Sequence, residues 1–160
     1  MEKILFGPAG NSQSFYDQGH SSTMEAPKWL AEQGADKFSG GLDLFEYSFG
    51  QGYRMSAETA EKLGEEFKKF GIEVSLHAPY FINFANPDEL MYEKSLGYVK
   101  TGIKFLKAFG AKRFVFHSGS CGKEIRENAI KLMTDRFKEF MPLFEQELDA
   151  DMFLCPETMG

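Results

Sequence analysis

The chain has 160 residues and a formal net charge of -6 at pH 7. With 42% hydrophobic and 26% charged residues, its composition is that of one soluble globular domain and excludes a disordered, collagen-like or membrane-spanning chain. The acidic balance argues against a protein that holds nucleic acid through a broad basic surface, although it leaves room for a local basic groove.

Five short apolar segments predict β-strands, because each one alternates or clusters apolar residues and then stops at glycine, proline or serine. They are residues 3–6, 42–49, 72–77, 113–117 and 152–155.

The segments between these strands predict helices. Ser22 and Glu25 have the spacing of a capping box, which indicates a first helix that ends at Gly34. Ser56 is suited to cap a second helix, whose apolar residues recur every three or four positions until Gly71.

Two further helices follow the same logic. Asn86-Pro87 predicts a cap followed by proline at the first helical position, and Glu89 completes a second capping box. Gly110 ends that helix. The last helix contains Pro142, which we expect to kink or split it.

Strands that alternate with helices predict an α/β fold with parallel strands and right-handed crossovers. This leaves a doubly wound open sheet or a (β/α)8 TIM barrel. Gly7-Pro8-Ala9-Gly10 after the first predicted strand matches neither a dinucleotide-binding fingerprint nor a P-loop, so its glycines are interpreted as turn formers. A complete barrel has about 250 residues, which this chain does not reach.

Polar residues collect at the carboxyl ends of the predicted strands. His77, His117 and Glu157 follow one another at intervals of 40 residues. Because the carboxyl ends of parallel strands face one cleft, these side chains are expected to converge. Two imidazoles and a carboxylate are typical ligands of a zinc-type metal.

Each of these residues also has a simpler interpretation. A single histidine after an apolar strand is more often a hydrogen-bonded structural residue than a ligand, and Glu157 after Cys155-Pro156 is compatible with a loop carboxylate. The position that all three share favours the metal site. Glu46 sits within the second predicted strand, where a structural role and a substrate-binding role are equally supported.

Five segments, taken in chain order, carry a family resemblance: FGPAG (6–10), LDLFEYSFG (42–50), SLHAPYFINFANP (75–87), AKRFVFHSGS (111–120) and LCPETMG (154–160). Together they resemble endonuclease IV, the apurinic/apyrimidinic endonuclease family of xylose isomerase-like TIM barrels. The resemblance implies that residues 1–160 form one partial (β/α)8 TIM barrel, with about the first five strands and four helices. We therefore expect the barrel to be truncated at its C-terminal side.

The resemblance also implies roles for individual residues. His77, His117 and Glu157 match positions that ligate one zinc ion of a trinuclear cluster, and Glu157 matches the catalytic carboxylate that bridges to a second ion. Tyr80 and Asn83 match the substrate-facing loop after the third predicted strand.

Other positions match less well. Arg54 lies where the second loop of the family enters abasic DNA, although a solvated surface arginine is the simpler interpretation. Glu46 is predicted to bind substrate because of its place within the second predicted strand, and not because it matches a family position. The first loop lacks the histidine that bacterial members carry, His20 matches no ligand position, and the ligands expected from the last three strands are missing.

The implied activity is zinc-dependent phosphodiester hydrolysis at abasic sites in DNA, as in base excision repair, with such DNA as the partner. The 160-residue chain alone is expected to be inactive or nearly so, because it lacks most of the cluster. Two alternatives stay open. One is a divalent-metal sugar isomerase or epimerase of the same fold. The other is a non-catalytic half-barrel that associates with itself through open sheet edges.

The 2 cysteines, Cys121 and Cys155, do not form a CxxC motif, so free thiols are expected. The N-terminal residues contain no apolar run of signal-peptide length, and no segment approaches a membrane span. A cytoplasmic protein without membrane contact is expected.

Overall fold

A parallel sheet forms the centre of the computed structural model, which describes residues 4–37 and 42–158. Its strands lie in the order β1-β2-β3-β4, and every neighbouring pair is parallel. The strands are β1 (Leu44–Ser48), β2 (Glu73–His77), β3 (Arg113–His117) and β4 (Phe153–Glu157). The α/β class with parallel strands is therefore confirmed.

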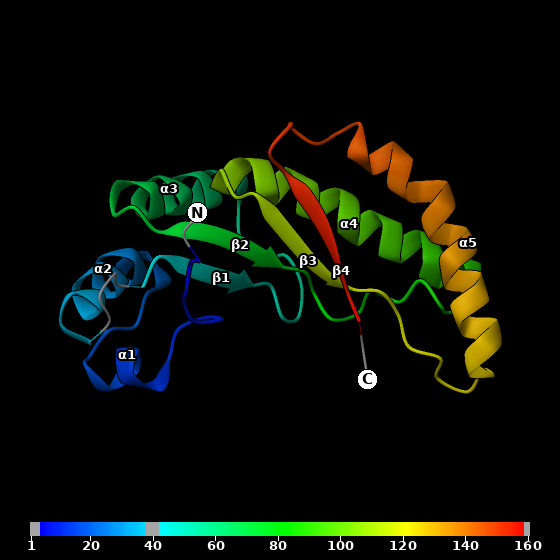
Figure 1. Cartoon of the computed structure of the whole chain (residues 1–160), viewed down its shortest axis with the longest axis horizontal. Coiled ribbons are helices and arrows are strands. Elements are labelled where there is room, and N and C mark those ends of the chain that lie inside the picture. The colour runs from blue at the N-terminus through cyan, green and yellow to red at the C-terminus, as the bar shows by residue number, and fades with distance from the viewer. Residues whose placement is uncertain (1–3, 38–41, 159–160) are drawn as a thin grey trace.

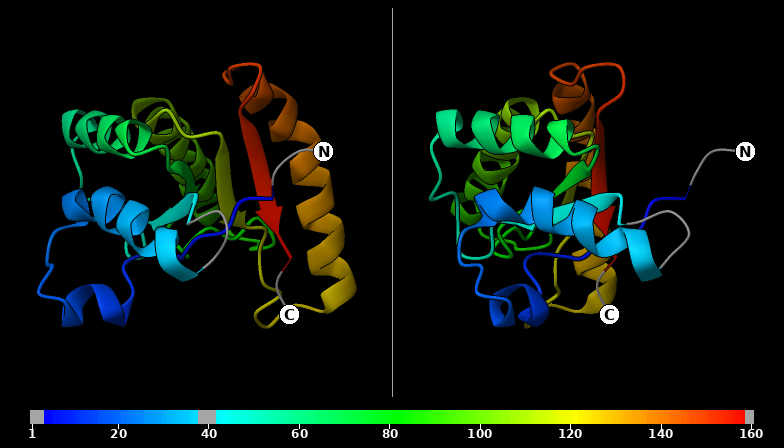
Figure 2. Two further views of the ribbon diagram at one scale, coloured as in Figure 1. Left: turned by 60° about the vertical axis from the view of Figure 1, so that its left-hand side comes forward. Right: turned by 90° about the vertical axis from the view of Figure 1, so that its left-hand side faces the viewer.

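Helices alternate with these strands. They are α1 (Gln13–Asp17), a short 3-10 turn (Thr23–Glu25) that leads into α2 (Ala26–Lys37), α3 (Ala57–Lys69), α4 (Glu89–Phe109) and α5 (Arg126–Glu145). Helices α3 and α4 pack side by side over one face of the sheet (Figure 1). Figure 2 places α2 at the β1 side and α5 at the β4 side, so the chain advances across the sheet in one direction.

The predicted strand at residues 3–6 is not observed. Residue 3 lies outside the described residues, and residues 4–8 are not in a strand. Ala9 forms a single parallel bridge to Glu46 instead. Pro8 has no N–H to donate, and Gly7 lies so close to β1 that a Cβ there would meet the Leu44 carbonyl oxygen at 1.5 Å. The described sheet therefore has four strands and not five.

The start of α4 also differs from the prediction. Asp88, not Asn86, is the N-cap, and its carboxylate accepts hydrogen bonds from the backbone N–H groups of Leu90 and Met91. Asn86 accepts from the Asp88 N–H at 3.0 Å, so its side chain closes a turn just before the helix. Asn86 and Asp88 are both suitable capping residues, and the helix is capped by Asp88.

Other helix limits also differ from those predicted. The capping box of Ser22 and Glu25 is present as predicted, but α2 continues past Gly34 to Lys37. Pro142 lies inside α5, which continues to Glu145 and is therefore not split. The short helix α1 was not predicted.

Alternation along each strand separates a packed face of the sheet from an open one. Phe45 stacks on Phe67 of α3 at 5.0 Å between ring centroids, and Phe114 lies against Gly102 of α4. The residues next to them in the strands therefore point to the opposite face. On that face Glu73 and Arg113 are exposed, whereas Ser75 is buried. Within the described part of the chain, no helix is long and apolar enough to cross a membrane.

Candidate metal centre

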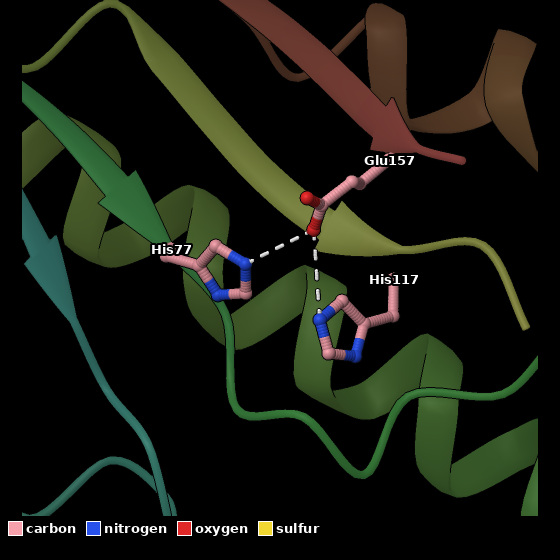
Figure 3. A group of neighbouring side chains, drawn as sticks. All are labelled: His77, His117 and Glu157. Atoms are coloured by element: carbon pink, nitrogen blue, oxygen red, sulfur yellow. Dashed lines mark hydrogen bonds and ion pairs between the residues drawn. The ribbon is translucent and has the colours of Figure 1, made fainter. Parts of the chain in front are cut away.

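Three predicted site residues occupy the last positions of neighbouring strands. His77 ends β2, His117 ends β3 and Glu157 ends β4. His117 pairs directly with Glu157, whereas His77 pairs with Val115, two residues before His117. An offset of two keeps all three side chains on one face of the sheet. Figure 3 shows them pointing toward one another.

The donor atoms of this group lie at distances that suit one metal ion. His77 Nε2 is 3.3 Å and His117 Nε2 is 3.5 Å from the same oxygen, Glu157 Oε2. All three ligand atoms lie within 4.8 Å of one another. Tetrahedral zinc with bonds of about 2.0–2.2 Å places neighbouring ligand atoms about 3.3–3.5 Å apart. The two nitrogen-to-oxygen distances therefore match the spacing of ligand atoms around such an ion.

A backbone carbonyl orients the His77 ring. His77 Nδ1 lies 2.8 Å from the carbonyl oxygen of Ala78. A carbonyl only accepts, so Nδ1 carries a proton, and the tautomer with that single ring proton has its lone pair at Nε2. Metal-binding histidines commonly donate their second ring N–H in this manner, which fixes both tautomer and ring orientation. The Ala78 N–H donates to Val115 of β3 at 2.8 Å, which holds the peptide in place.

Exposure of the group is uneven. The side chains of His77 and His117 are 19% and 20% exposed, whereas that of Glu157 is 49% exposed. The two histidine rings are therefore mostly buried, and the carboxylate side is open to solvent. An ion held by these three residues would be open to a water molecule or a substrate group on that side, as in catalytic zinc sites with three protein ligands.

Two predicted substrate-binding residues lie on or after β1. Glu46 is on the open face, where its carboxylate accepts a hydrogen bond from the Ser75 hydroxyl at 3.4 Å. It lies two residues before the end of β1, about 6.6 Å along the strand from Ser48, which pairs with His77. Arg54 lies in the loop after β1 and lines a depression of about 750 Å³ formed by that loop and the start of α3.

The loop between β2 and α4 contains the other two predicted substrate-binding residues, Tyr80 and Asn83. Tyr80 is half exposed, and its ring lies 4.6 Å from that of Phe81, which is equally exposed. The Asn83 side chain is bonded to backbone: Oδ1 accepts from Ala85 N–H at 3.0 Å and Ser120 N–H at 3.1 Å, and Nδ2 donates to Ser120 O at 3.2 Å. Substrate binding by Tyr80, Asn83, Arg54 and Glu46 stays a prediction.

Two residues near the group escaped the sequence analysis. Phe81 forms an exposed aromatic pair with Tyr80, and two adjacent aromatic residues directly after His77-Ala78-Pro79 were a usable signal. Ser118 is buried, and its hydroxyl donates to the backbone carbonyl of Glu157 at 2.8 Å. Its position directly after the candidate ligand His117 was the sequence signal that could have identified Ser118.

Residues predicted to lie outside the site do so. His20 bonds through Nδ1 to Glu25 at 3.2 Å and stacks on Phe15 at 4.9 Å. It belongs to the turn that precedes α2. Cys121 and Cys155 are free cysteines, as expected.

The curated relatives are similar over part of the chain. A probable endonuclease 4 of Aquifex aeolicus (strain VF5) is 34% identical over 91 residues, which are 54% of this chain and 32% of that protein. A probable endonuclease 4 of Mycoplasmoides gallisepticum is 30% identical over 86 residues, which are 53% of this chain and 27% of that protein. The matches thus cover about a third of these relatives.

Solved structures show the fold. A D-psicose 3-epimerase crystallised in the presence of D-fructose matches 87% of this chain and 47% of its own, with a TM-score of 0.68 and 9% identity. Endonuclease IV of Thermus thermophilus matches 83% of this chain and 45% of its own, with a TM-score of 0.51 and 17% identity. About half of each barrel is covered.

The family comparison agrees with the parallel sheet. The model of the xylose isomerase-like TIM barrel matches residues 29–160, which is most of the chain. The chain therefore belongs to the xylose isomerase-like TIM barrel family.

Proposed function

We propose that the protein hydrolyses phosphodiester bonds at abasic sites in DNA in a zinc-dependent reaction, as a step of base excision repair. The observation that carries the proposal is the group of His77, His117 and Glu157, with two nitrogen-to-oxygen distances of 3.3 and 3.5 Å. The choice of DNA as substrate is supported by the partial similarity to the endonuclease 4 of Aquifex aeolicus. Because the match covers 32% of that relative, the proposal concerns the activity of the whole protein.

The three side chains have separable tasks in this proposal. His77 and His117 would hold zinc through neutral Nε2 atoms, and the Ala78 carbonyl keeps the His77 ring in the required tautomer. Glu157 faces both rings through Oε2 while its second oxygen points away from them (Figure 3), and this carboxylate would also bind a second ion. When bound, zinc supplies a Lewis acid for the phosphate and lowers the pKa of a water molecule.

The loops around the group offer contacts for a nucleic acid. Tyr80 and Phe81 present exposed aromatic surface three and four residues after His77, and aromatic rings stack on bases and sugars. Arg54 offers a guanidinium for a phosphate at the same end of the sheet. In the proposal, these residues bind the strand while the group at the strand ends acts on the scissile phosphate.

A nicking assay tests the proposal. The whole protein, expressed from its complete gene, is incubated with a duplex that carries one abasic site, with zinc and with a chelator in parallel. Zinc-dependent cleavage on the 5′ side of the abasic site is expected, and His77→Ala should abolish it. A matched duplex without the abasic site should stay intact. A protein that binds zinc and leaves the abasic duplex uncut would exclude this function.

A second candidate is a sugar isomerase or epimerase that uses the same metal site. It is favoured by the net charge of -6, which suits a small substrate better than DNA, and by the likeness of fold to the D-psicose 3-epimerase. Conversion of a ketohexose to its epimer in the presence of a divalent metal, without nicking of DNA, would select this candidate. Nicking without epimerisation would exclude it.

A further inference from the structure

Asn83 joins the loop after β2 to the loop after β3. Its Oδ1 accepts hydrogen bonds from the backbone N–H groups of Ala85 in its own loop, at 3.0 Å, and of Ser120 in the other loop, at 3.1 Å. Its Nδ2 donates to the Ser120 carbonyl at 3.2 Å. The Asn83 side chain thus both donates to and accepts from the backbone of Ser120, which lies 37 residues later in the sequence.

The same contacts continue to the strand ends. The Phe84 N–H donates to the carbonyl of Ser118 at 3.2 Å. Ser118 directly follows His117, and both its N–H and its hydroxyl donate to the Glu157 carbonyl, at 3.3 and 2.8 Å. A continuous set of hydrogen bonds therefore runs from the loop after His77, through the residue next to His117, to the backbone of Glu157.

The junction is tightly packed. A Cβ on Gly119 would lie 2.8 Å from Asn83 Oδ1 and 2.9 Å from the Ala85 nitrogen. The close approach of the two loops therefore depends on glycine at this position. Both polar atoms of the Asn83 side chain are already bonded to backbone, so its geometry suits the support of the loops better than contact with a substrate.

We propose that Asn83 is a positioning residue: it sets the spacing between His77 and His117 and thereby the affinity and geometry of the metal site. The inference rests on the proposed function, because it assumes that the group at the strand ends binds a metal. Residues that hold metal ligands in place typically contribute about 10–100-fold to metal affinity when they are removed.

Cobalt(II) titration of the chain provides the test, because its visible spectrum reports both affinity and coordination geometry. Asn83→Ser is the informative variant. A serine hydroxyl can still accept from the Ala85 N–H within its own loop, but it is too short to reach Ser120. We expect cobalt binding about 10–100-fold weaker than in the unmodified chain, with a changed spectrum at saturation. Asn83→Ala should behave alike and also lose thermal stability.

Asn86→Ala is the matched control. Asn86 lies in the same loop, and its side chain accepts from the Asp88 N–H at 3.0 Å, so its bond stays within the loop. It should leave the cobalt affinity and spectrum unchanged. Asn83→Ser with unchanged affinity and spectrum would overturn the inference even if its melting temperature fell, because the role would then be structural. Failure of the unmodified chain to bind cobalt would overturn the metal site itself, and the inference with it.

Discussion

At the scale of single residues, His77 shows how the backbone prepares a ligand. The hydrogen bond of Nδ1 to the Ala78 carbonyl selects the tautomer that leaves Nε2 facing Glu157 Oε2. The imidazole of His117 meets the same oxygen, and the two rings lie 5.2 Å apart at an interplanar angle of 80°. This convergence on a single oxygen is the reason to expect that each histidine contributes to metal binding.

His117→Ala tests that expectation. Loss of one of three ligands should weaken zinc binding by more than about 100-fold, beyond the effect of removing a residue that only orients a ligand. The measurement is a zinc titration in competition with a chromophoric chelator. His20→Ala is the control, because His20 lies in the turn before α2 and contacts Glu25. Comparable zinc affinity in both variants would exclude His117 as a ligand.

Glu25 makes stability depend on pH. Its carboxylate accepts hydrogen bonds from the backbone N–H groups of Ser22 and Ser21, and these, together with the bond to His20, lower its pKa from 4.5 to about 2. A carboxyl with a lowered pKa in the folded state stabilises the fold above its unfolded pKa. This contribution is lost as the pH falls from 4.5 to about 2.

Glu25→Gln should therefore lower the melting temperature at neutral pH, and the difference from the unmodified chain should narrow on acidification across that window. Thermal unfolding followed by circular dichroism at several pH values measures it. Glu61→Gln, at an exposed position of α3, is the control. A difference that stays constant down to a pH of about 2 would contradict the role of the carboxylate charge.

At the scale of elements, α4 fits the sheet through a glycine. A Cβ on Gly102 would meet the Phe114 ring at 2.0 Å, and Phe114 is fully buried. Gly97 lies about one and a half turns earlier in the same helix, and a Cβ there would meet nothing within 4 Å. Substitution of each glycine by alanine therefore distinguishes the effect of packing on stability, at Gly102, from the effect of helix propensity, at Gly97.

Gly102→Ala should lower the free energy of unfolding by about 1–3 kcal/mol, because a buried ring cannot move aside without strain. Gly97→Ala should raise it by up to about 1 kcal/mol, because alanine loses less conformational entropy in a helix. Urea unfolding of both variants measures the difference. Equal effects of the two substitutions would show that α4 does not pack on β3 in this manner.

A buried arginine connects α5 to the loop that contains Asn83. Arg136 is 5% exposed, its guanidinium lies 4.2 Å from the Tyr92 ring centroid, and it donates to the Phe84 carbonyl at 3.1 Å. It also donates to the Asn86 carbonyl and, at 2.7 Å, to Glu89. Because Phe84 follows Asn83 directly, Arg136 of α5 holds the backbone of this loop next to Asn83.

At the scale of the molecule, the sheet has an open face and an open edge. Within the described residues, β4 pairs with β3 on one side only, whereas residues 6–10 bond to part of β1. Phe153 of β4 is 54% exposed. Unpaired strand edges favour association, and exposed apolar side chains strengthen it.

We expect the chain to associate with itself in a concentration-dependent manner. Phe153→Lys should shift it toward the monomer, because a charge on an edge strand opposes pairing. Size-exclusion chromatography with light scattering measures the mass. Leu143→Lys is the control, since Leu143 is 62% exposed and belongs to α5 and not to a strand. A monomer at all concentrations would contradict the expected association.

The sequence by itself determined the repeating architecture and the three strand-end residues. Each strand and the helix that follows it form one unit, so an interval of 40 residues returns His77, His117 and Glu157 to equivalent positions. Alternation then places them on one face. Local patterns suffice here, because strand ends and side-chain direction depend on neighbouring residues.

The tertiary structure decided the features that depend on distant residues. The contact of β1 with residues 6–10 replaced the predicted first strand. Asn83 was predicted to face substrate, and only the folded chain shows that its amide meets Ser120, 37 residues later. No repeating pattern of residues predicts such a contact, because its geometry depends on how the two loops pack against each other.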